Sequence, residues 1–193
     1  QRLKEKYKII NSKKPIIFLL HPDKLSKEKN RIRSYQILKV LSKLNRDIIC
    51  VYPCTDIGYQ GIISSLNKFK NKKFFHIYQN IPYSDFISLI KFSEFMIGNS
   101  SSGIIESSYL KTNVINLGSR QNGRLYNRNV FHSDFNMTNI NKLINKLMNK
   151  KKPILLKKKI YGTGNAYKKT YKIINKLLKQ KELKTDKLFN LLK

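Results

Sequence analysis

The stretch GNSSSGIIE, residues 98–106, is the most informative part of this sequence of 193 residues. It follows the apolar run FMI and places glycine, asparagine and three serines before a second apolar pair and a glutamate. Glycine permits tight backbone geometry and the close approach of a ligand, and serine caps helices and offers hydroxyl groups. The pattern predicts a strand that ends at Gly98 and a helix over residues 102–111.

The same alternation recurs on both sides of this stretch. Short apolar runs rich in β-branched residues are typical of buried strands, and they alternate with segments whose apolar residues recur at helical spacing. Strands are predicted at 15–21, 47–53, 73–79, 94–98 and 113–118, and helices at 25–44, 56–69, 83–93, 102–111 and 138–150. Residues 161–180 are predicted to form a glycine-punctuated turn followed by a basic amphipathic helix. Such βαβ units predict an α/β fold, a Rossmann-like parallel sheet flanked by helices on both faces.

Three local features complete the predicted organisation. Asp56 and Ser84 are expected to cap the helices that they precede. Residues 119–136 have little periodicity and are interpreted as a long polar loop. The domain is expected to span residues 15–180, after a basic linker or N-terminal extension (1–14) and before a basic helical tail (181–193).

The composition is strongly basic, with 40 Lys and Arg against 11 Asp and Glu and a net charge of +29. This balance is consistent with polyanionic partners. A general bias in residue usage accounts for it better, because lysine, asparagine and isoleucine are dense along the whole chain. No apolar run approaches the roughly 20 residues of a membrane span, so no membrane association is expected.

The cysteines and the spacing of possible metal ligands indicate which kinds of site are not expected. Cys50 and Cys54 lie close together without a partner pair or a nearby metal-ligand pattern, which argues against a disulfide framework or a zinc site. A reducing, cytoplasmic setting is expected, and neither a metal nor a cofactor.

Three segments at the carboxyl ends of predicted strands suit a nucleoside diphosphate. The serines of 98–106 and the start of the following helix can bind phosphate, and the carboxylate of Glu106 can accept two hydrogen bonds from ribose hydroxyls. Arg120 and Arg124, in SRQNGR, can add charge-assisted bonds to a diphosphate. A serine-capped helix and two solvated arginines explain the same residues without a ligand, and both interpretations stay open on these residues alone.

The sequence resembles a known family at this point. MIGNSSSGIIESSYLKTNVINLGSRQNGR (96–124) resembles the signature of the UDP-N-acetylglucosamine 2-epimerases, in their hydrolysing branch. FLLHPDK (18–24), YPCTDIG (52–58), IPYSDFISLI (81–90) and YGTGNA (161–166) resemble further landmarks of this family, in the same order. The resemblance covers roughly residues 15–180.

The resemblance implies the C-terminal half of a two-domain, GT-B-type fold, with the active site in the cleft between two Rossmann-like halves. It implies a UDP-sugar substrate and a partner half, the N-terminal one, that carries the acid and base residues. A homo-oligomer is expected for the full enzyme. The implied reaction converts UDP-N-acetylglucosamine to N-acetylmannosamine and UDP, for the biosynthesis of sialic-acid-type sugars.

The resemblance also assigns roles to individual residues. His21 corresponds to a histidine near the phosphates and the reacting sugar, and is the candidate catalytic residue. The candidate UDP-binding residues are His21, Cys54, Ile81 (through its backbone, to the uracil), Ser100, Ser101, Glu106 (to the ribose), Arg120 and Arg124. Asp56 and Gly58 correspond to a turn that faces the cleft. Cys54 departs from the family, which usually has asparagine there, so the choice of nucleotide is less certain; as a nucleophile Cys54 is disfavoured, since no base is located beside it.

Three other functions are alternatives to the epimerase on the sequence alone. The chain can be a nucleotide-sugar-binding module without catalysis, or a glycosyltransferase of similar architecture. A nucleic-acid-binding protein would rest on charge alone, and the sequence has no helix-turn-helix or RNA-binding motif, so no specific nucleic acid is expected.

Overall fold

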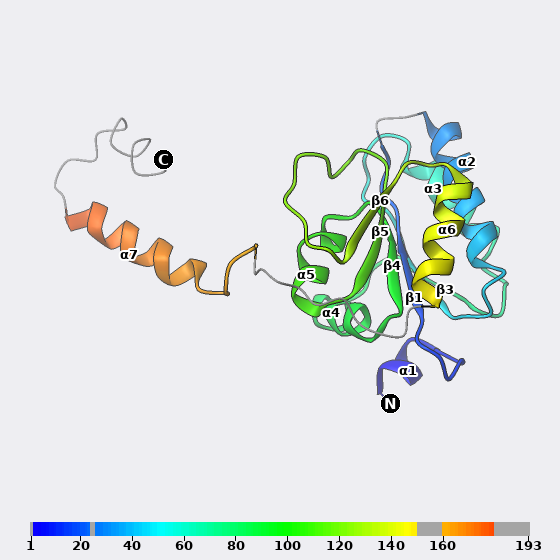
Figure 1. The fold of residues 1–193 in the computed structure, drawn as a ribbon, viewed down its shortest axis with the longest axis horizontal. Coiled ribbons are helices and arrows are strands. Elements are labelled where there is room, and N and C mark those ends of the chain that lie inside the picture. The colour runs from blue at the N-terminus through cyan, green and yellow to red at the C-terminus, as the bar shows by residue number, and fades with distance from the viewer. Residues whose placement is uncertain (1, 24–25, 150–159, 180–193) are drawn as a thin grey trace. The chain divides into compact units, whose positions relative to one another are not determined.

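A six-stranded, fully parallel sheet organises the protein in the computed structural model (Figure 1). The structure describes residues 2–23, 26–149 and 160–179. It divides into two units, residues 1–158 and residues 159–193, and each is described by itself. The strands are β1 (Ile16–Leu19), β2 (Ile48–Val51), β3 (Phe75–Tyr78), β4 (Phe95–Gly98), β5 (Asn113–Leu117) and β6 (Val130–Ser133).

The helices of the first unit are α1 (Arg2–Lys6), α2 (Lys27–Leu41), α3 (Tyr59–Asn67), α4 (Tyr83–Phe92), α5 (Glu106–Leu110) and α6 (Met137–Met148), with the 3-10 turn η1 (Ser101–Gly103). The second unit contains α7 (Ala166–Lys179). In the described part of the chain, no helix is both long and apolar enough to cross a lipid bilayer.

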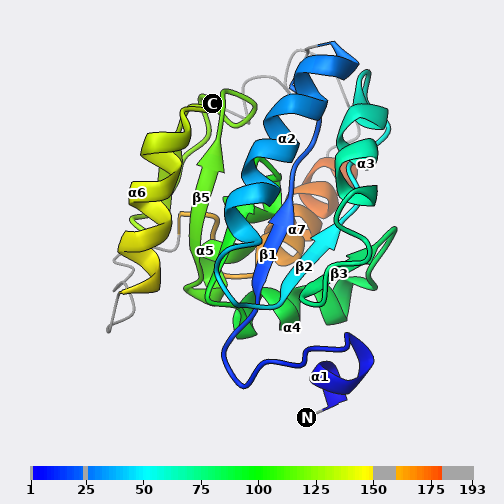
Figure 2. The same cartoon turned by 90° about the vertical axis from the view of Figure 1, so that its right-hand side faces the viewer.

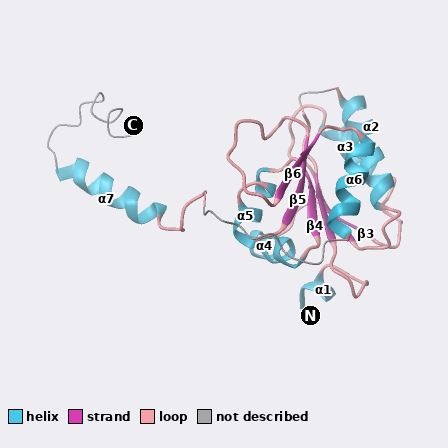
Figure 3. Ribbon diagram, in the orientation of Figure 1, coloured by secondary structure: helices cyan, strands magenta, loops and turns pink. Residues whose placement is uncertain are grey.

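The strand order is β3-β2-β1-β4-β5-β6, and every neighbouring pair is parallel. Figure 3 shows the strands of the first unit as one layer between helices. The chain builds outward from β1 to β3, then returns to place β4 on the other side of β1. A doubly wound sheet has its topological switch point where the order reverses, here between β1 and β4, and ligands bind there outside the carboxyl ends of the strands. The predicted α/β fold class is confirmed.

Two hydrophobic clusters cover the two faces of the sheet. Alternate residues point to opposite faces, so Ile16 and Phe18 join one cluster and Ile17 and Leu19 join the other. The first cluster packs against α2, α3 and α6, which lie in front of the sheet in Figure 2. The second packs against α1 and α4. With both faces buried, the sheet fixes where each strand ends.

The segment predicted as a linker, residues 1–14, is attached to the second cluster. Tyr7 is buried there, its hydroxyl donates to Asp85 at 2.6 Å, and its ring meets Tyr78 edge-on. These contacts anchor the chain directly before β1. The predicted limits of the domain stay a prediction, and the predicted tail, residues 181–193, lies outside the described residues.

Four local predictions were wrong. The predicted loop 119–136 contains β6, a short edge strand with only two apolar residues, Val130 and Phe131, too few to stand out as an apolar run. The helix predicted at 102–111 is divided into η1 and α5. Asp56 does not cap α3, whose N-cap is Gly58, and α4 begins at Tyr83 with Pro82 as N-cap, so Ser84 lies inside its first turn.

Candidate nucleotide-binding site

Five of the candidate residues lie just beyond the carboxyl end of a strand. His21 follows β1, Cys54 follows β2, Ile81 follows β3, Ser100 follows β4 and Arg120 follows β5. Because all five strands are parallel, their carboxyl ends form one edge of the sheet. The candidates therefore share the edge at which doubly wound folds bind ligands.

Asn99 joins the loops at the switch point. This residue is completely buried, and its side chain pairs with the backbone of His21: the His21 N–H donates to Oδ1 at 2.7 Å, and Nδ2 donates to the His21 carbonyl at 3.0 Å. Gln121 donates from Nε2 to the Asn99 carbonyl at 2.8 Å. Asn99 thus ties the segments after β1, β4 and β5 together.

The turn after β4 places Ser100 and Ser101 beside this junction. Ser100 is 7% exposed and accepts a hydrogen bond from the Ser102 N–H, and the Ser100 and Ser102 hydroxyls are 2.8 Å apart. The N–H groups of the next three residues donate to the Ser100 and Ser101 carbonyls. These are the regular first bonds of a helical turn that has Ser100 as its N-cap. The binding of a phosphate by the serine hydroxyls and this helix start stays a prediction.

Glu106 opens α5 and has an unsatisfied oxygen. Its Oε2 atom is buried and has no hydrogen-bond partner within the described residues. A buried carboxylate oxygen without a donor is costly. This atom is therefore available for a donor from a ligand, as a ribose hydroxyl would supply.

A hydrogen-bonded cluster joins His21, Cys54, Asp56 and Arg120. The Cys54 N–H donates to His21 Nδ1 at 2.9 Å, and the Cys54 thiol donates to Asp56 at 3.1 Å. Arg120 forms an ion pair with Asp56 at 2.9 Å, and its NH2 group lies 3.7 Å from the Cys54 sulfur. The structure thus brings together residues from three segments that are far apart in sequence, and Asp56 holds the arginine that was expected at a diphosphate.

The environment of His21 determines its protonation. Burial, with a further contribution from the Arg120 charge, lowers the pKa of His21 to about 4, and Asp56 opposes this shift. Because Nδ1 accepts from the Cys54 amide, the neutral ring carries its proton on Nε2. At neutral pH His21 is consequently a hydrogen-bond donor through Nε2.

Cys54 is not prepared for nucleophilic chemistry. Burial raises the pKa of its thiol, and the hydrogen bond to Asp56 adds to that shift. The thiolate is the reactive form, so the observed environment agrees with a structural cysteine. Its backbone N–H, by contrast, orients His21.

The other candidates stand outside this cluster. Gly58 is the buried N-cap of α3. Ile81 is buried in the second hydrophobic cluster, before α4. Arg124 is exposed, and its N–H donates to the Gln121 carbonyl at 3.3 Å. Within the described residues, no hydrogen bond joins Ile81, Glu106 or Arg124 to the His21 cluster.

Two positioning residues, Asn99 and Gln121, were missed by sequence reasoning. Both lie inside the quoted stretches 98–106 and 119–124, where only the serines and the charged residues were assigned roles. Their position inside two polar stretches, each after a buried strand, was the available signal. Their hydrogen bonds depend on β1, β4 and β5 being brought together.

Comparison with protein families matches residues 1–175 to the family described as UDP-N-acetylglucosamine 2-epimerase. Among curated relatives, the UDP-N,N'-diacetylbacillosamine 2-epimerase (hydrolyzing) of Legionella pneumophila is 28% identical over 170 residues, which are 88% of this chain and 45% of the relative. The UDP-N-acetylglucosamine 2-epimerase of Neisseria meningitidis serogroup B is 32% identical over 126 residues, 64% of this chain and 33% of the relative.

Among solved structures, the UDP-GlcNAc 2-epimerase of Methanocaldococcus jannaschii, in complex with UDP-GlcNAc and UDP, superposes with a TM-score of 0.69 at 17% identity. The match covers 91% of this chain and 48% of that protein. The chain therefore spans less than half the length of these relatives. The predicted resemblance to one half of a two-domain GT-B-type fold is confirmed.

Proposed function

Because the chain belongs to the UDP-N-acetylglucosamine 2-epimerase family, we propose that it holds the UDP of a UDP-sugar and serves as the nucleotide-binding half of a hydrolysing 2-epimerase. The proposed reaction converts UDP-N-acetylglucosamine to N-acetylmannosamine and UDP, for sialic-acid-type sugars. The observation that carries this proposal is the convergence of His21, Ser100 and Arg120 at the switch point, through the hydrogen bonds of Asn99 and Gln121.

We assign different candidate residues to the diphosphate, the ribose and the uracil of UDP. The hydroxyls of Ser100 and Ser101 and the guanidinium of Arg120 bind the diphosphate, with Arg124 as a further cation. The unsatisfied oxygen of Glu106 accepts from the ribose. The backbone at Ile81 contacts the uracil, as the resemblance implies.

The proposed chemistry is an elimination followed by hydration. A base takes the proton from C2 of the sugar, the C2–H electrons form the C1=C2 double bond, and the C1–O bond breaks so that UDP leaves with its electron pair. Water then adds across the double bond of the glycal, and N-acetylmannosamine is released. The C2 proton is weakly acidic, so catalysis requires a well-placed base and strong stabilisation of the departing diphosphate.

This chain would supply the leaving-group side of that reaction. Arg120 and the serine hydroxyls stabilise the charge that develops on the diphosphate, and His21 donates a hydrogen bond from Nε2 to it. The pKa of about 4 argues against an imidazolium acid at neutral pH. The N-terminal half, as partner, would carry the base.

Calorimetric titration of this chain with UDP, UMP and GDP tests the nucleotide site. We expect UDP to bind more tightly than UMP, and Glu106→Ala to weaken UDP binding by about 10- to 100-fold, because a buried charged acceptor is lost. Glu94→Ala is the matched control, since Glu94 lies at the opposite edge of the sheet, just before β4, and should leave UDP binding unchanged. Equal binding of all three nucleotides, in proportion to charge and steeply dependent on salt, would instead indicate a general polyanion surface.

The second candidate function is a nucleotide-sugar-binding module without catalysis. This function requires the convergence of His21, Ser100 and Arg120 but no catalytic base. Adding an N-terminal half from a relative and assaying the release of the 2-epimerised sugar separates the two. Release restored by the added half, and lost again in Arg120→Ala, supports the epimerase.

A further inference from the structure

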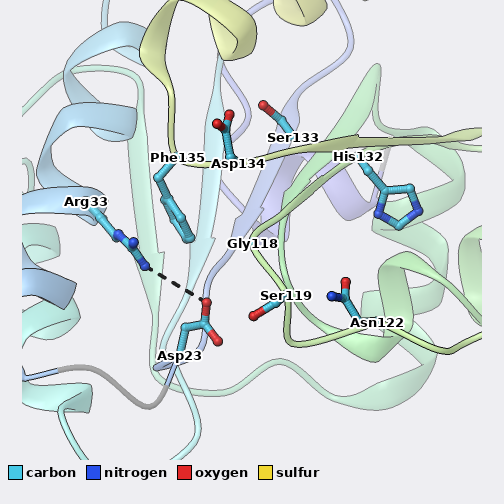
Figure 4. A pocket seen from close by; sticks show the side chains of 9 residues that line it. All are labelled: Asp23, Arg33, Gly118, Ser119, Asn122, His132, Ser133, Asp134 and Phe135. Carbon is cyan, nitrogen blue, oxygen red and sulfur yellow. Dashed lines mark ion pairs between the residues drawn. The ribbon is translucent and has the colours of Figure 1, made fainter.

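A pocket of about 470 Å³ lies where β1, β5 and β6 end, next to α2 (Figure 4). In Figure 4, Asp23, Arg33 and Phe135 lie on one side of it and face Ser119 on the other. Ser119 directly precedes Arg120 in the loop after β5. This pocket therefore belongs to the candidate nucleotide site.

A separate pocket, of about 370 Å³, runs along the free side of the edge strand β3. Five consecutive residues, 75–79, contribute to its lining, together with Lys8, Tyr52, Asn67 and Lys70. Successive side chains of a strand point to opposite faces of the sheet, so a pocket that all five residues line must follow the side of the strand. The strands β2 and β1 separate β3 from the switch point.

This β3 pocket presents donors and positive charge. Lys8 and Lys70 line it, and no carboxylate is among the described residues of its lining. Neither lysine forms an ion pair with another described residue. The carbonyls of Phe74 and Tyr78 accept from backbone N–H groups at the two ends of β2, so the alternating backbone places the Ile77 N–H on the free side. Three donors, two of them cationic, favour a phosphate group, which has several acceptor oxygens.

His76 adds an acceptor to the same pocket. Its side chain is 8% exposed, and its Nε2 atom lies 2.6 Å from Oδ1 of the completely buried Asp47. Oδ2 of Asp47 accepts from the Asn11 N–H at 2.6 Å. With both carboxylate oxygens as acceptors, Nε2 carries the proton of a ring that holds one proton. Nδ1, which has no hydrogen-bond partner among the described residues, is then an acceptor that suits a hydroxyl group.

The size of the β3 pocket indicates a ligand larger than a free phosphate. Its volume of about 370 Å³ lies within the range of about 300–1,000 Å³ that is usual for small-molecule sites. Tyr52, Phe75 and Tyr78 add aromatic surface to the lining. The lining thus suits a phosphate attached to a small carbon skeleton that carries hydroxyl groups.

We propose that the β3 pocket binds a small hydroxylated phosphate monoester, of the sugar-phosphate class, independently of the nucleotide site. Lys8, Lys70 and the Ile77 N–H bind the phosphate, and a hydroxyl group of the ligand donates to Nδ1 of His76. Lys8 belongs to the segment 1–14 and Lys70 to the turn after α3, so the ligand connects these two parts of the chain. Because it binds the folded protein, it should also raise the temperature of unfolding.

Calorimetric titrations of the Arg120→Ala chain with glucose 6-phosphate, inorganic phosphate and glucose at neutral pH test this proposal. The Arg120→Ala background weakens the binding of phosphates at the nucleotide site. Glucose 6-phosphate should bind about threefold or more tightly than inorganic phosphate, because its hydroxyl groups add the bond to His76. Glucose, which lacks the phosphate, should not bind at millimolar concentration.

Variants on the same background identify the pocket. Lys8→Gln and Lys70→Gln should each weaken the binding of glucose 6-phosphate by about three- to tenfold, since each removes one charge-assisted bond. His76→Gln should have an effect of similar size, and the two exposed lysines keep the test independent of its effect on folding. Lys72→Gln is the matched control, an exposed lysine in the same turn that does not line the pocket, and it should change binding less than about twofold.

The outcomes are distinct. Losses in Lys8→Gln and Lys70→Gln, with Lys72→Gln unchanged, support the β3 pocket. Three results overturn it: no binding of glucose 6-phosphate at millimolar concentration, an equal loss in Lys72→Gln, or inorganic phosphate binding as tightly as the monoester, which would mean an adventitious anion only. The titration of the wild type with UDP decides the proposed function separately, whatever the β3 pocket binds.

Discussion

The loops after β4 and β5 both belong to the candidate site, yet they are built differently. In the turn that begins at Gly98, Asn99 is fully buried and Ser100 nearly so. In the loop 119–124, Arg120 and Arg124 are exposed, although Gln121 is buried. Hydrogen bonds to the backbone hold the first loop in place, whereas the second loop presents exposed charged side chains to a ligand. The loops after two neighbouring strands thus supply rigid geometry and accessible charge, respectively.

The largest expected difference between the two loops is in the loss of stability when the glycine of each, Gly98 or Gly123, is replaced by alanine. Gly98 has φ +149°, and a Cβ there would lie 1.8 Å from the Leu19 carbonyl oxygen, which belongs to the paired strand β1. Gly98→Ala should lower the free energy of unfolding by about 4 kcal/mol or more, as severe core clashes do. Gly123 has φ +80°, and no atom lies within 4 Å of the position that a Cβ would take, so Gly123→Ala should cost only about 1–2 kcal/mol.

Urea unfolding of both variants measures this difference. The midpoint should fall much further for Gly98→Ala than for Gly123→Ala, with similar slopes. Equal losses would show that the turn after β4 can relax, and that the contrast between the two loops is one of exposure alone.

The next effect concerns Asn99, whose side chain holds the turn to the backbone of His21. Asn99→Ala removes both hydrogen bonds to that backbone and leaves a buried N–H and carbonyl unpaired. We expect a loss of about 2–4 kcal/mol in unfolding free energy and a loss of UDP binding, since His21 and Ser100 are no longer held together. Asn122→Ala, an exposed asparagine in the other loop, should change stability by less than about 0.5 kcal/mol. Similar losses in the two variants would contradict the proposed role of Asn99.

The difference between the loops also explains what the sequence could predict. The strands from β1 to β5 were found because each is a short, largely apolar run between polar or turn residues, and that pattern does not depend on tertiary contacts. The edge strand β6 was missed because only Val130 among its residues is fully buried. Helix caps were wrong at Asp56 and Ser84, since the chain there uses Gly58 and Pro82 instead.

Within the site, the predictable part was which strand ends carry polar residues. The pairing of Asn99 with the His21 backbone joins residues 78 positions apart, and that of Arg120 with Asp56 spans 64. Neither pairing leaves a local pattern in the sequence. The pocket at Asp23 and Phe135 was missed for the same reason, because its lining comes from four separate segments.

The pH dependence of stability sharpens the comparison, since His21 contacts both regions. Its backbone bonds to Asn99, and its ring bonds to the Cys54 amide beside Arg120. The folded-state pKa of about 4 is below the ordinary 6.5, so the unfolded chain binds more protons between these values. The stability that His21 contributes is therefore fully present above pH 6.5 and is lost as the pH falls toward 4.

Thermal or urea unfolding of the wild type and of His21→Gln, from pH 7 to pH 4, measures this contribution. Over that range the wild type should lose about 2–3 kcal/mol more than the variant. All other ionisable groups are common to both proteins, so their contributions cancel in the difference. Parallel pH profiles would mean that His21 is not desolvated in the folded protein.

The smallest effect concerns the exposed loop, where Asp56 competes with a ligand for Arg120. The pair is 2.9 Å apart with side chains 30% and 55% exposed, so it contributes little to stability. Asp56→Asn should leave unfolding unchanged within about 0.5 kcal/mol. It should also tighten UDP binding about two- to threefold, since Arg120 is released and one negative charge near the diphosphate is removed. On an Arg120→Ala background the same substitution should have a smaller effect, because only the charge repulsion remains. If Asp56→Asn instead weakens UDP binding, the aspartate positions Arg120 for the ligand, and the exposed loop is as preorganised as the buried turn.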